Sequence, residues 1–287
     1  MAAEVLSTPV AVGRRERTGK VWSLWLLPPF LLLAVLVVYP LVLVALESFT
    51  GGLTTWREVV GSAEFRDALV RTIQIAVGST AGCLLVGTFL AVVISFVPFP
   101  GARVVSGLVD AMLALPSFLV ALSFTFIYGA AGVLGSLVGS LVGDSAFLTT
   151  PWAVILAEIT FYTPFVMRPL LGAMGQLPRA QLDVAASLGA GPWRVLRQVV
   201  LPEVRPALAA GGSLTLLLTL NEFGIVLFLG ARDTTTLPML VHTKGIVMFD
   251  YPGACVIAVV QIVLSITLYV ALRAALTRAG GSRARLD

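Results

Sequence analysis

The sequence predicts an all-α, polytopic membrane protein with six transmembrane helices. Two observations support this fold class. Hydrophobic residues make up 58% of the 287-residue chain and charged residues only 12%, which is about half the charged fraction of an average soluble domain. The hydrophobic residues also gather in six runs, each longer than the roughly 20 residues that a helix needs to cross a bilayer.

The six runs predict one transmembrane domain over residues 22–276, with short cytoplasmic tails at 1–21 and 277–287. The first run is too long for a secretory signal and no small-residue cleavage site follows it, so we expect it to remain as a membrane anchor. Pro116 interrupts the third run. The runs lie near residues 22–46, 68–97, 104–129, 152–174, 206–230 and 253–276.

The basic residues predict the orientation of these helices. With both termini in the cytoplasm, thirteen of the nineteen Lys and Arg residues lie inside and five lie outside, as the positive-inside rule requires. Residues 47–67 and 231–252 then face outward. The net charge of +4 follows from this topology, so it does not indicate a nucleic-acid surface.

The chain offers few groups for catalysis. It has a single His and two Cys, and both Cys lie within hydrophobic runs, which excludes a disulfide framework and a Cys/His metal cluster. Residues 13–20 are similar to an ATP-binding loop, but five residues separate the two glycines and Val21 stands where Ser or Thr is needed. We therefore expect neither an enzyme nor a cofactor site in this chain.

A polar segment between the fourth and fifth runs carries the clearest functional signal. Residues 183–202 read Asp-Val-Ala-Ala-Ser-Leu-Gly-Ala-Gly-Pro-Trp-Arg-Val-Leu-Arg-Gln-Val-Val-Leu-Pro. We predict a short helix from about Pro178 to Leu188, because proline suits a first helical position and Gly189 suits the left-handed position after the last turn. Pro192 then begins a second amphipathic turn. An interfacial amphipathic segment without a partner is the alternative.

This segment resembles the cytoplasmic EAA loop of binding-protein-dependent ABC importer permeases. Asp183 stands where the family usually has Glu, Gly189 at the fixed glycine, and Leu201-Pro202 at the closing Leu-Pro. The resemblance covers about residues 68–276 and implies a type I ABC importer permease bundle in which residues 177–205 contain a coupling helix. The residues that it assigns to ATPase coupling are Asp183, Ala185, Ala186, Gly189, Leu201 and Pro202.

The resemblance also implies partners and a location. The partners are a second permease subunit, identical or related, two ATPase subunits that hold ATP and Mg²⁺, and an extracytoplasmic solute-binding protein. The location is the bacterial inner (plasma) membrane.

Two acidic residues within the runs are candidates for the translocation pathway. Glu158 and Glu222 each lie about 10 to 12 Å below the external surface at 1.5 Å rise per residue, so both could line one cavity. Asn221 adjoins Glu222, and Tyr162 follows Glu158 by four residues. Charged residues at such depth are costly and often functional. The alternative is that each carboxyl is protonated or hydrogen-bonds a neighbouring helix.

Three other features carry weaker expectations. Asp110 is expected to pair with Arg103 or Arg168, and His242 is expected to be a solvated loop residue. Glycines recur every four residues between 135 and 143, which suits either a packing face of a helix or a flexible loop.

Residues 221–230 and 249–258 resemble the permeases for 2-aminoethylphosphonate. These permeases belong to a wider group for ferric iron, thiamine and polyamines. We favour 2-aminoethylphosphonate as the solute, although an acid-lined cavity suits a polyamine equally well. An ion-coupled secondary transporter and an assembly subunit without a pathway are the alternatives from other classes.

Overall fold

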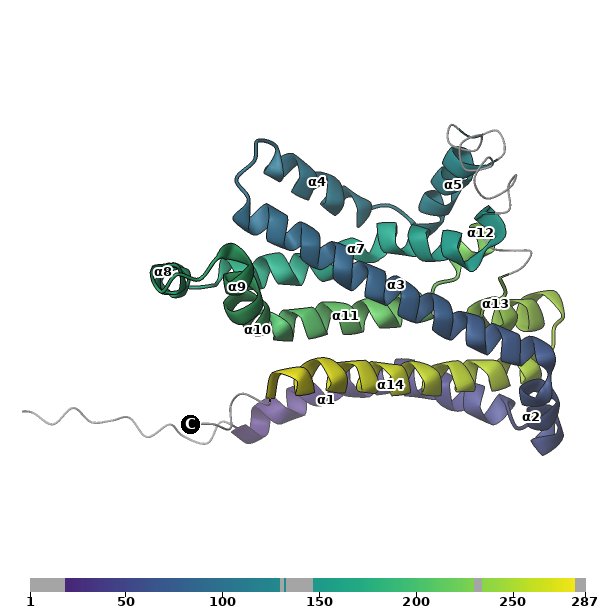
Figure 1. Ribbon diagram of the computed structural model, residues 1–287. Helices are drawn as coiled ribbons and strands as arrows, with labels where there is room; N and C mark the ends of the chain where they lie inside the picture. The colour runs from purple at the N-terminus through teal and green to yellow at the C-terminus, as the bar shows by residue number, and fades with distance from the viewer. Residues whose placement is uncertain (1–18, 130–131, 133–146, 230–233, 282–287) are drawn as a thin grey trace, which may run out of the picture. The chain divides into compact units, whose positions relative to one another are not determined.

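The computed structural model describes residues 19–129, 132, 147–229 and 234–281. Within these residues all regular structure is helical, which confirms the all-α fold class (Figure 1). The chain divides into two compact units, residues 1–46 and 47–287. The first unit holds nearly all of α1 (Gly19–Glu47), whose stretch Leu27–Glu47 is long and apolar enough to cross a membrane.

In the second unit, α7 (Pro151–Gly175) is the central helix, and it packs against α3 (Ala63–Phe96) and α11 (Arg205–Leu220). Its most apolar window is 61% buried, against 28% for α3 and 22% for the last helix, α14 (Tyr251–Gly281). Lipid is as apolar as a leucine side chain, so helix association here depends on close packing. The face of α3 that packs against α7 carries the small residues Cys83, Gly87 and Ala91.

The third predicted span is broken, as Pro116 indicated. It consists of α4 (Ala102–Met112) and α5 (Ser117–Tyr128), whose axes differ by 108°. Pro116 is the extended N-cap residue of α5, since proline has no N–H to continue a helical ladder.

The fifth predicted span, 206–230, is not a continuous helix. The 16-residue α11 ends at Leu220, and a second helix, α12, runs from Gly224 to Leu229. At 1.5 Å per residue α11 is about 24 Å long, which is shorter than the roughly 30 Å hydrocarbon core. In the part of the chain that the structure describes, four helices are long enough to span a membrane, or five with α4–α5 as one span. The predicted count of six is therefore not fully confirmed.

The predicted external connections contain helices. α2 (Gly52–Gly61) lies within residues 47–67, and α13 (Leu237–His242) with the π-helical turn η3 (Thr243–Val247) lies within 231–252. The expectation for His242 was wrong, because it ends α13 half-buried, with its ring 5.0 Å from the ring of Phe223.

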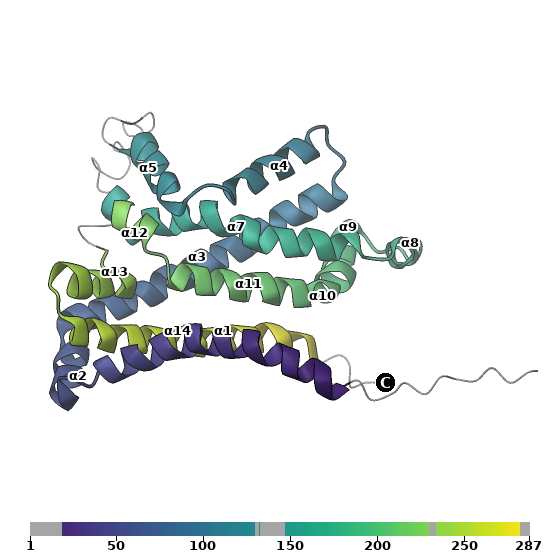
Figure 2. The ribbon, with the colours of Figure 1, turned by 180° about the vertical axis from the view of Figure 1, so that it is seen from behind.

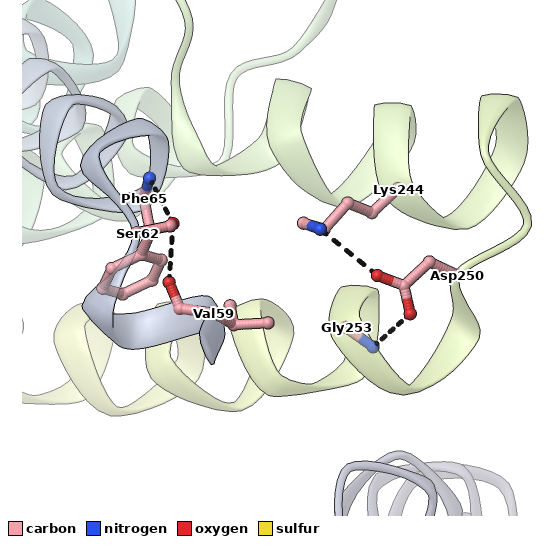
Figure 3. Close-up of polar contacts among 6 residues, drawn as sticks. All are labelled: Val59, Ser62, Phe65, Lys244, Asp250 and Gly253. Atoms are coloured by element: carbon pink, nitrogen blue, oxygen red, sulfur yellow. Dashed lines mark hydrogen bonds and ion pairs between the residues drawn. The ribbon is translucent and has the colours of Figure 1, made fainter. Parts of the chain in front are cut away.

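Polar side chains fix where α3 and α14 begin (Figure 3). The Ser62 hydroxyl accepts a hydrogen bond from the Phe65 N–H at 3.2 Å. The Asp250 carboxylate accepts one from the Gly253 N–H at 3.0 Å and pairs with the Lys244 ammonium group at 3.2 Å. Both acceptors satisfy N–H groups that a helix start leaves unpaired.

The second unit has two distinct ends (Figures 1 and 2). One end carries the turn before α4 and the helices α8 (Arg179–Ser187), α9 (Pro192–Val195) and α10 (Leu201–Glu203). The opposite end carries α2, α5, α12 and α13. The segments predicted to share a side of the membrane therefore share an end of the unit. The glycine repeat after 132 and most of the predicted tails lie outside the described residues.

Candidate functional site

Helix α8 and the turn after it have the predicted backbone geometry. Gly189 has φ +77°, and its N–H donates to the Ala186 carbonyl at 2.9 Å. The Ala190 N–H reaches back to the Ala185 carbonyl at 3.0 Å. These two bonds form a Schellman motif, in which the residue at the left-handed position is usually glycine. The sequence-based prediction of this helix and of the conformation of Gly189 is confirmed.

The chain returns to the bundle through a π-helical turn, η2 (Leu196–Val200). The Leu201 N–H donates to the Leu196 carbonyl, five residues earlier, and Pro202 has no N–H to restore the α-helical ladder. Val200 and Val204 are only 2% and 1% exposed and belong to the main hydrophobic cluster. They anchor this segment. Residues 176–195, between the end of α7 and the start of η2, therefore form a projection with a fixed base, which we call the α8 loop.

The α8 loop presents an unusual surface. Apolar side chains of Val184, Leu188 and Trp193 are 57%, 81% and 71% exposed. Asp183 is also exposed. Exposed apolar groups rimmed by polar ones are typical of a binding surface for another protein.

A second polar site lies inside the bundle, around the carboxyl group of Glu222. We define the Glu222 junction as Glu222, Ser117, Tyr162 and Ile225. The Glu222 Oε1 atom accepts hydrogen bonds from the Ser117 hydroxyl at 3.1 Å and from the Ile225 N–H at 2.8 Å. The Tyr162 hydroxyl donates to Oε2. Glu222 and Tyr162 are 7% and 5% exposed, so this carboxyl has three donors in place of water.

Glu158 lies one helical turn before Tyr162 on α7 and is fully buried. Neither of its carboxyl oxygens has a hydrogen-bond partner among the described residues. Ser79 of α3 lies beside it. An ionised carboxylate is energetically costly at such a site without a partner. Glu158 differs from Glu222 in this respect, because the Glu222 carboxyl accepts three hydrogen bonds and the Glu158 carboxyl accepts none among the described residues.

The structure brings Glu222 and Tyr162 together, with Glu158 on the same helix as Tyr162, but it separates Asn221 from them. The Asn221 amide donates to the Leu217 carbonyl at 2.7 Å and lines a groove of about 380 Å³ with His242 and Gln261. Asn221 and Glu222 are adjacent in the break after α11, but Asn221 faces the groove whereas Glu222 contacts α5 and α7.

Asp110 pairs with Arg168, one of the two expected partners. This ion pair joins α4 to α7, and both side chains are partly exposed.

Ser117 is a member of the Glu222 junction that sequence reasoning missed. The available signal was a hydroxyl residue directly after the proline that interrupts the third apolar run.

Long apolar helices, two interrupted helices that meet at a buried carboxyl, and a projecting polar loop define a polytopic membrane transport protein. The family model for "binding-protein-dependent transport system inner membrane component" matches residues 83–279. The chain belongs to this family, as an inner membrane permease of an ABC importer and not an enzyme.

Individual relatives agree with this family. PhnU from Salmonella typhimurium, named as a 2-aminoethylphosphonate transport system permease protein, is 50% identical over 266 residues, covering 90% of this chain and 93% of PhnU. The sulfate transport system permease protein CysT from Escherichia coli is 30% identical over 200 residues, covering 68% and 70%.

Solved structures show the same fold. A bacterial ABC transporter for alginate import contains a chain that matches with a TM-score of 0.78 at 19% identity, covering 90% of this chain and 96% of that one. The MetNI methionine ABC transporter contains a chain that matches with a TM-score of 0.58 at 20% identity, covering 75% and 95%.

Proposed function

We propose that this permease imports 2-aminoethylphosphonate. The observation that carries the proposal is the 50% identity to PhnU over 90% of the chain. An acidic environment suits the amine of this solute, and the two carboxyls of Glu158 and Glu222 supply one. The alternative solutes are ferric iron, a polyamine and thiamine.

The test starts with the binding protein. Calorimetry with the purified solute-binding protein would measure which of these solutes it captures, and proteoliposomes with the complete importer would measure uptake of labelled solute. We expect capture and ATP-dependent uptake of 2-aminoethylphosphonate. Capture of putrescine or ferric iron with no response to 2-aminoethylphosphonate would contradict the assignment.

We also propose the assembly. Two permease subunits, identical or related, associate with two ATPase subunits, which hold ATP and Mg²⁺, and with an extracytoplasmic solute-binding protein. The α8 loop docks on the ATPase through the residues named for coupling above. The exposed Val184, Leu188 and Trp193 support this role because they offer an apolar surface on the projecting α8 loop.

The proposed orientation places both termini and the α8 loop in the cytoplasm. Single cysteines can test it after Cys83 and Cys255 are replaced, because these are the two native thiols. A cysteine at the exposed Ser187 should resist an impermeant reagent added to intact cells, whereas one at the exposed Arg57 should react. The reverse pattern would overturn the orientation.

The proposed translocation pathway includes Glu222, Tyr162, Glu158 and Asn221. Asn221, beside the groove, and Glu222, with its buried carboxyl, both belong to the break after α11. We propose that movement at this break brings the groove and the buried carboxyl into one path. A Glu222→Gln variant keeps the shape of the side chain and removes its charge, so uptake should fall while assembly persists. Unchanged uptake would remove Glu222 from the pathway.

A further inference from the structure

Two helix breaks that are far apart in the sequence meet in space. The first separates α4 from α5 and the second separates α11 from α12. Ser117 is the first residue of α5, and Glu222 lies within the second break. Their side chains are joined by a hydrogen bond across 105 positions of sequence.

The short helices that follow the breaks pack against each other. The rings of Phe118 and Phe228 are 5.6 Å apart. The fit is close at Gly224, where a Cβ atom would lie 3.0 Å from the Ser117 hydroxyl and 3.3 Å from Glu222 Oε1. Both helices lie at the end of the unit opposite α8 (Figures 1 and 2). We call α5 and α12 the paired helices.

The two oxygens of Glu222 have different roles. Oε1 accepts from Ser117 and from Ile225, which belong to α5 and α12. It therefore holds the paired helices together. Oε2 accepts from Tyr162, which belongs to the uninterrupted α7. It therefore ties the pair to the central helix, and it is the polar contact that adds to the apolar packing of α5 and α12 against α7.

We propose that the paired helices move as one gate, and that the Tyr162–Glu222 hydrogen bond is the latch that keeps this gate closed against α7. The non-helical residues at the two breaks can absorb the change in backbone angles that a hinge requires. Release exposes the α7 face that carries Tyr162 and, one turn away, the unpartnered carboxyl of Glu158. Glu158 then gains water or solute as a partner. The proposal rests on the transport function, but not on the identity of the solute.

The direct test measures the position of α5 relative to α7. Spin labels at Phe126 on α5 and Trp152 on α7 suit this test because these side chains are 75% and 68% exposed. The complete importer, with Cys83 and Cys255 replaced, would be measured without ATP in lipid nanodiscs. We expect Tyr162→Phe to shift the distance distribution toward a second, longer population. Tyr269→Phe, which removes a hydroxyl from α14, is the matched control and should leave the distribution unchanged.

A functional readout separates a latch from a general packing role. If the latch holds the resting state, Tyr162→Phe should raise ATP hydrolysis in the absence of binding protein by about tenfold, as expected for loss of one hydrogen bond to a carboxyl. The ratio of ATP hydrolysis with binding protein to ATP hydrolysis without it should decrease by a similar factor. Equal distances and equal basal hydrolysis in Tyr162→Phe and the parent protein would overturn the proposal.

Ser117 provides a second pair of variants in case Tyr162→Phe does not assemble. Ser117→Ala should broaden the α5–α7 distances, and Ser117→Thr, which keeps the hydroxyl, should restore them. Parent-like distances in Ser117→Ala would also overturn the proposal. None of these measurements needs the solute, so a failure of the 2-aminoethylphosphonate assignment would leave their results interpretable.

Discussion

The α8 loop and the Glu222 junction are both polar regions of an apolar bundle, but different kinds of contact hold them. The α8 loop is closed by backbone bonds such as Gly189 N–H to Ala186, three residues apart. The Glu222 junction depends on partners 60 and 105 positions away. A locally closed loop keeps its shape when the helices around it move, whereas a junction between distant elements changes with them. This difference suits a rigid docking element at one end and a movable element at the other.

The largest effect is expected where the distant contacts are removed. Glu222→Leu would leave the Ser117 and Tyr162 hydroxyls and the Ile225 N–H without their acceptor. Each unpaired buried donor costs about 1 to 3 kcal/mol. The Tyr162 hydroxyl and the Ile225 N–H are buried, whereas Ser117 is partly buried, so we expect a loss of at least about 2 kcal/mol in the stability of the assembled importer. Thermal unfolding in detergent, monitored by size exclusion, would measure it. Glu222→Gln is the control, and parent-like stability of Glu222→Leu would show that the junction is not structural.

A second long-range contact can extend the comparison. The Thr72 hydroxyl oxygen accepts a hydrogen bond from the Leu237 N–H at 2.8 Å, which joins α3 to the start of α13. Thr72→Val leaves a buried N–H unpaired and should cost about 2 kcal/mol, whereas Thr72→Ser keeps the acceptor and should cost less. Hydrogen exchange of α13 would report the difference. Equal protection in the two variants would contradict this role of the hydroxyl.

The α8 loop offers a pair of glycines that differ mainly in backbone angle. Around Gly189 and Gly191 the space for a Cβ atom is open, but φ is +77° at Gly189 and −67° at Gly191. Gly189→Val should cost about 1 to 2 kcal/mol of local stability and uncouple ATP hydrolysis from the binding protein. Gly191→Val should remain coupled because its angles suit a residue before proline. If both variants hydrolyse ATP as the parent does, the left-handed turn is not needed for coupling.

The smallest effect is expected at the ion pair between Asp110 and Arg168. Both side chains are partly exposed, at 31% and 45%, and an ion pair that water reaches contributes about 1 kcal/mol or less. A double-mutant cycle with Asp110→Asn and Arg168→Gln should therefore give a coupling energy below about 1 kcal/mol in thermal unfolding. A value of several kcal/mol would show that this pair, and not only the Glu222 junction, fixes α4–α5 on α7.

The difference between contacts within a short segment and contacts between distant segments also explains which features the sequence could predict. The α8 helix and its left-handed glycine were predictable because a Pro-helix-Gly pattern is decided by neighbouring residues. The break at Pro116 was predictable for the same reason. The end of α11 at Leu220 was not, because residues 206–230 form one apolar run and the side chains that stabilise the break come from α5 and α7. The hydropathy of the sequence indicates which residues lie in the membrane, but it does not indicate which side chains donate hydrogen bonds to the Glu222 carboxyl.

The candidate site was predictable to a similar degree. Glu158 and Glu222 stood out as acidic groups at similar depth, and Tyr162 was a candidate because it follows Glu158 by one helical turn, but the contact between Tyr162 and Glu222 was not predicted. Ser117 and the separate surroundings of Asn221 depend on how the broken helices turn, which no periodicity in the sequence encodes.

The short length of α11 has a consequence for the surrounding lipid. About 24 Å of helix stands beside α3, whose 34 residues extend roughly 50 Å. The first turns of α3 carry four charged residues and can extend beyond the hydrocarbon core, whereas α11 is shorter than that core, so either the bilayer thins near α11 or α12 covers the remaining depth. Acyl chains of different length would favour one solution or the other, and transport rates in liposomes of graded chain length should pass through a maximum. The membrane itself would then take part in setting how readily the α11–α12 break bends.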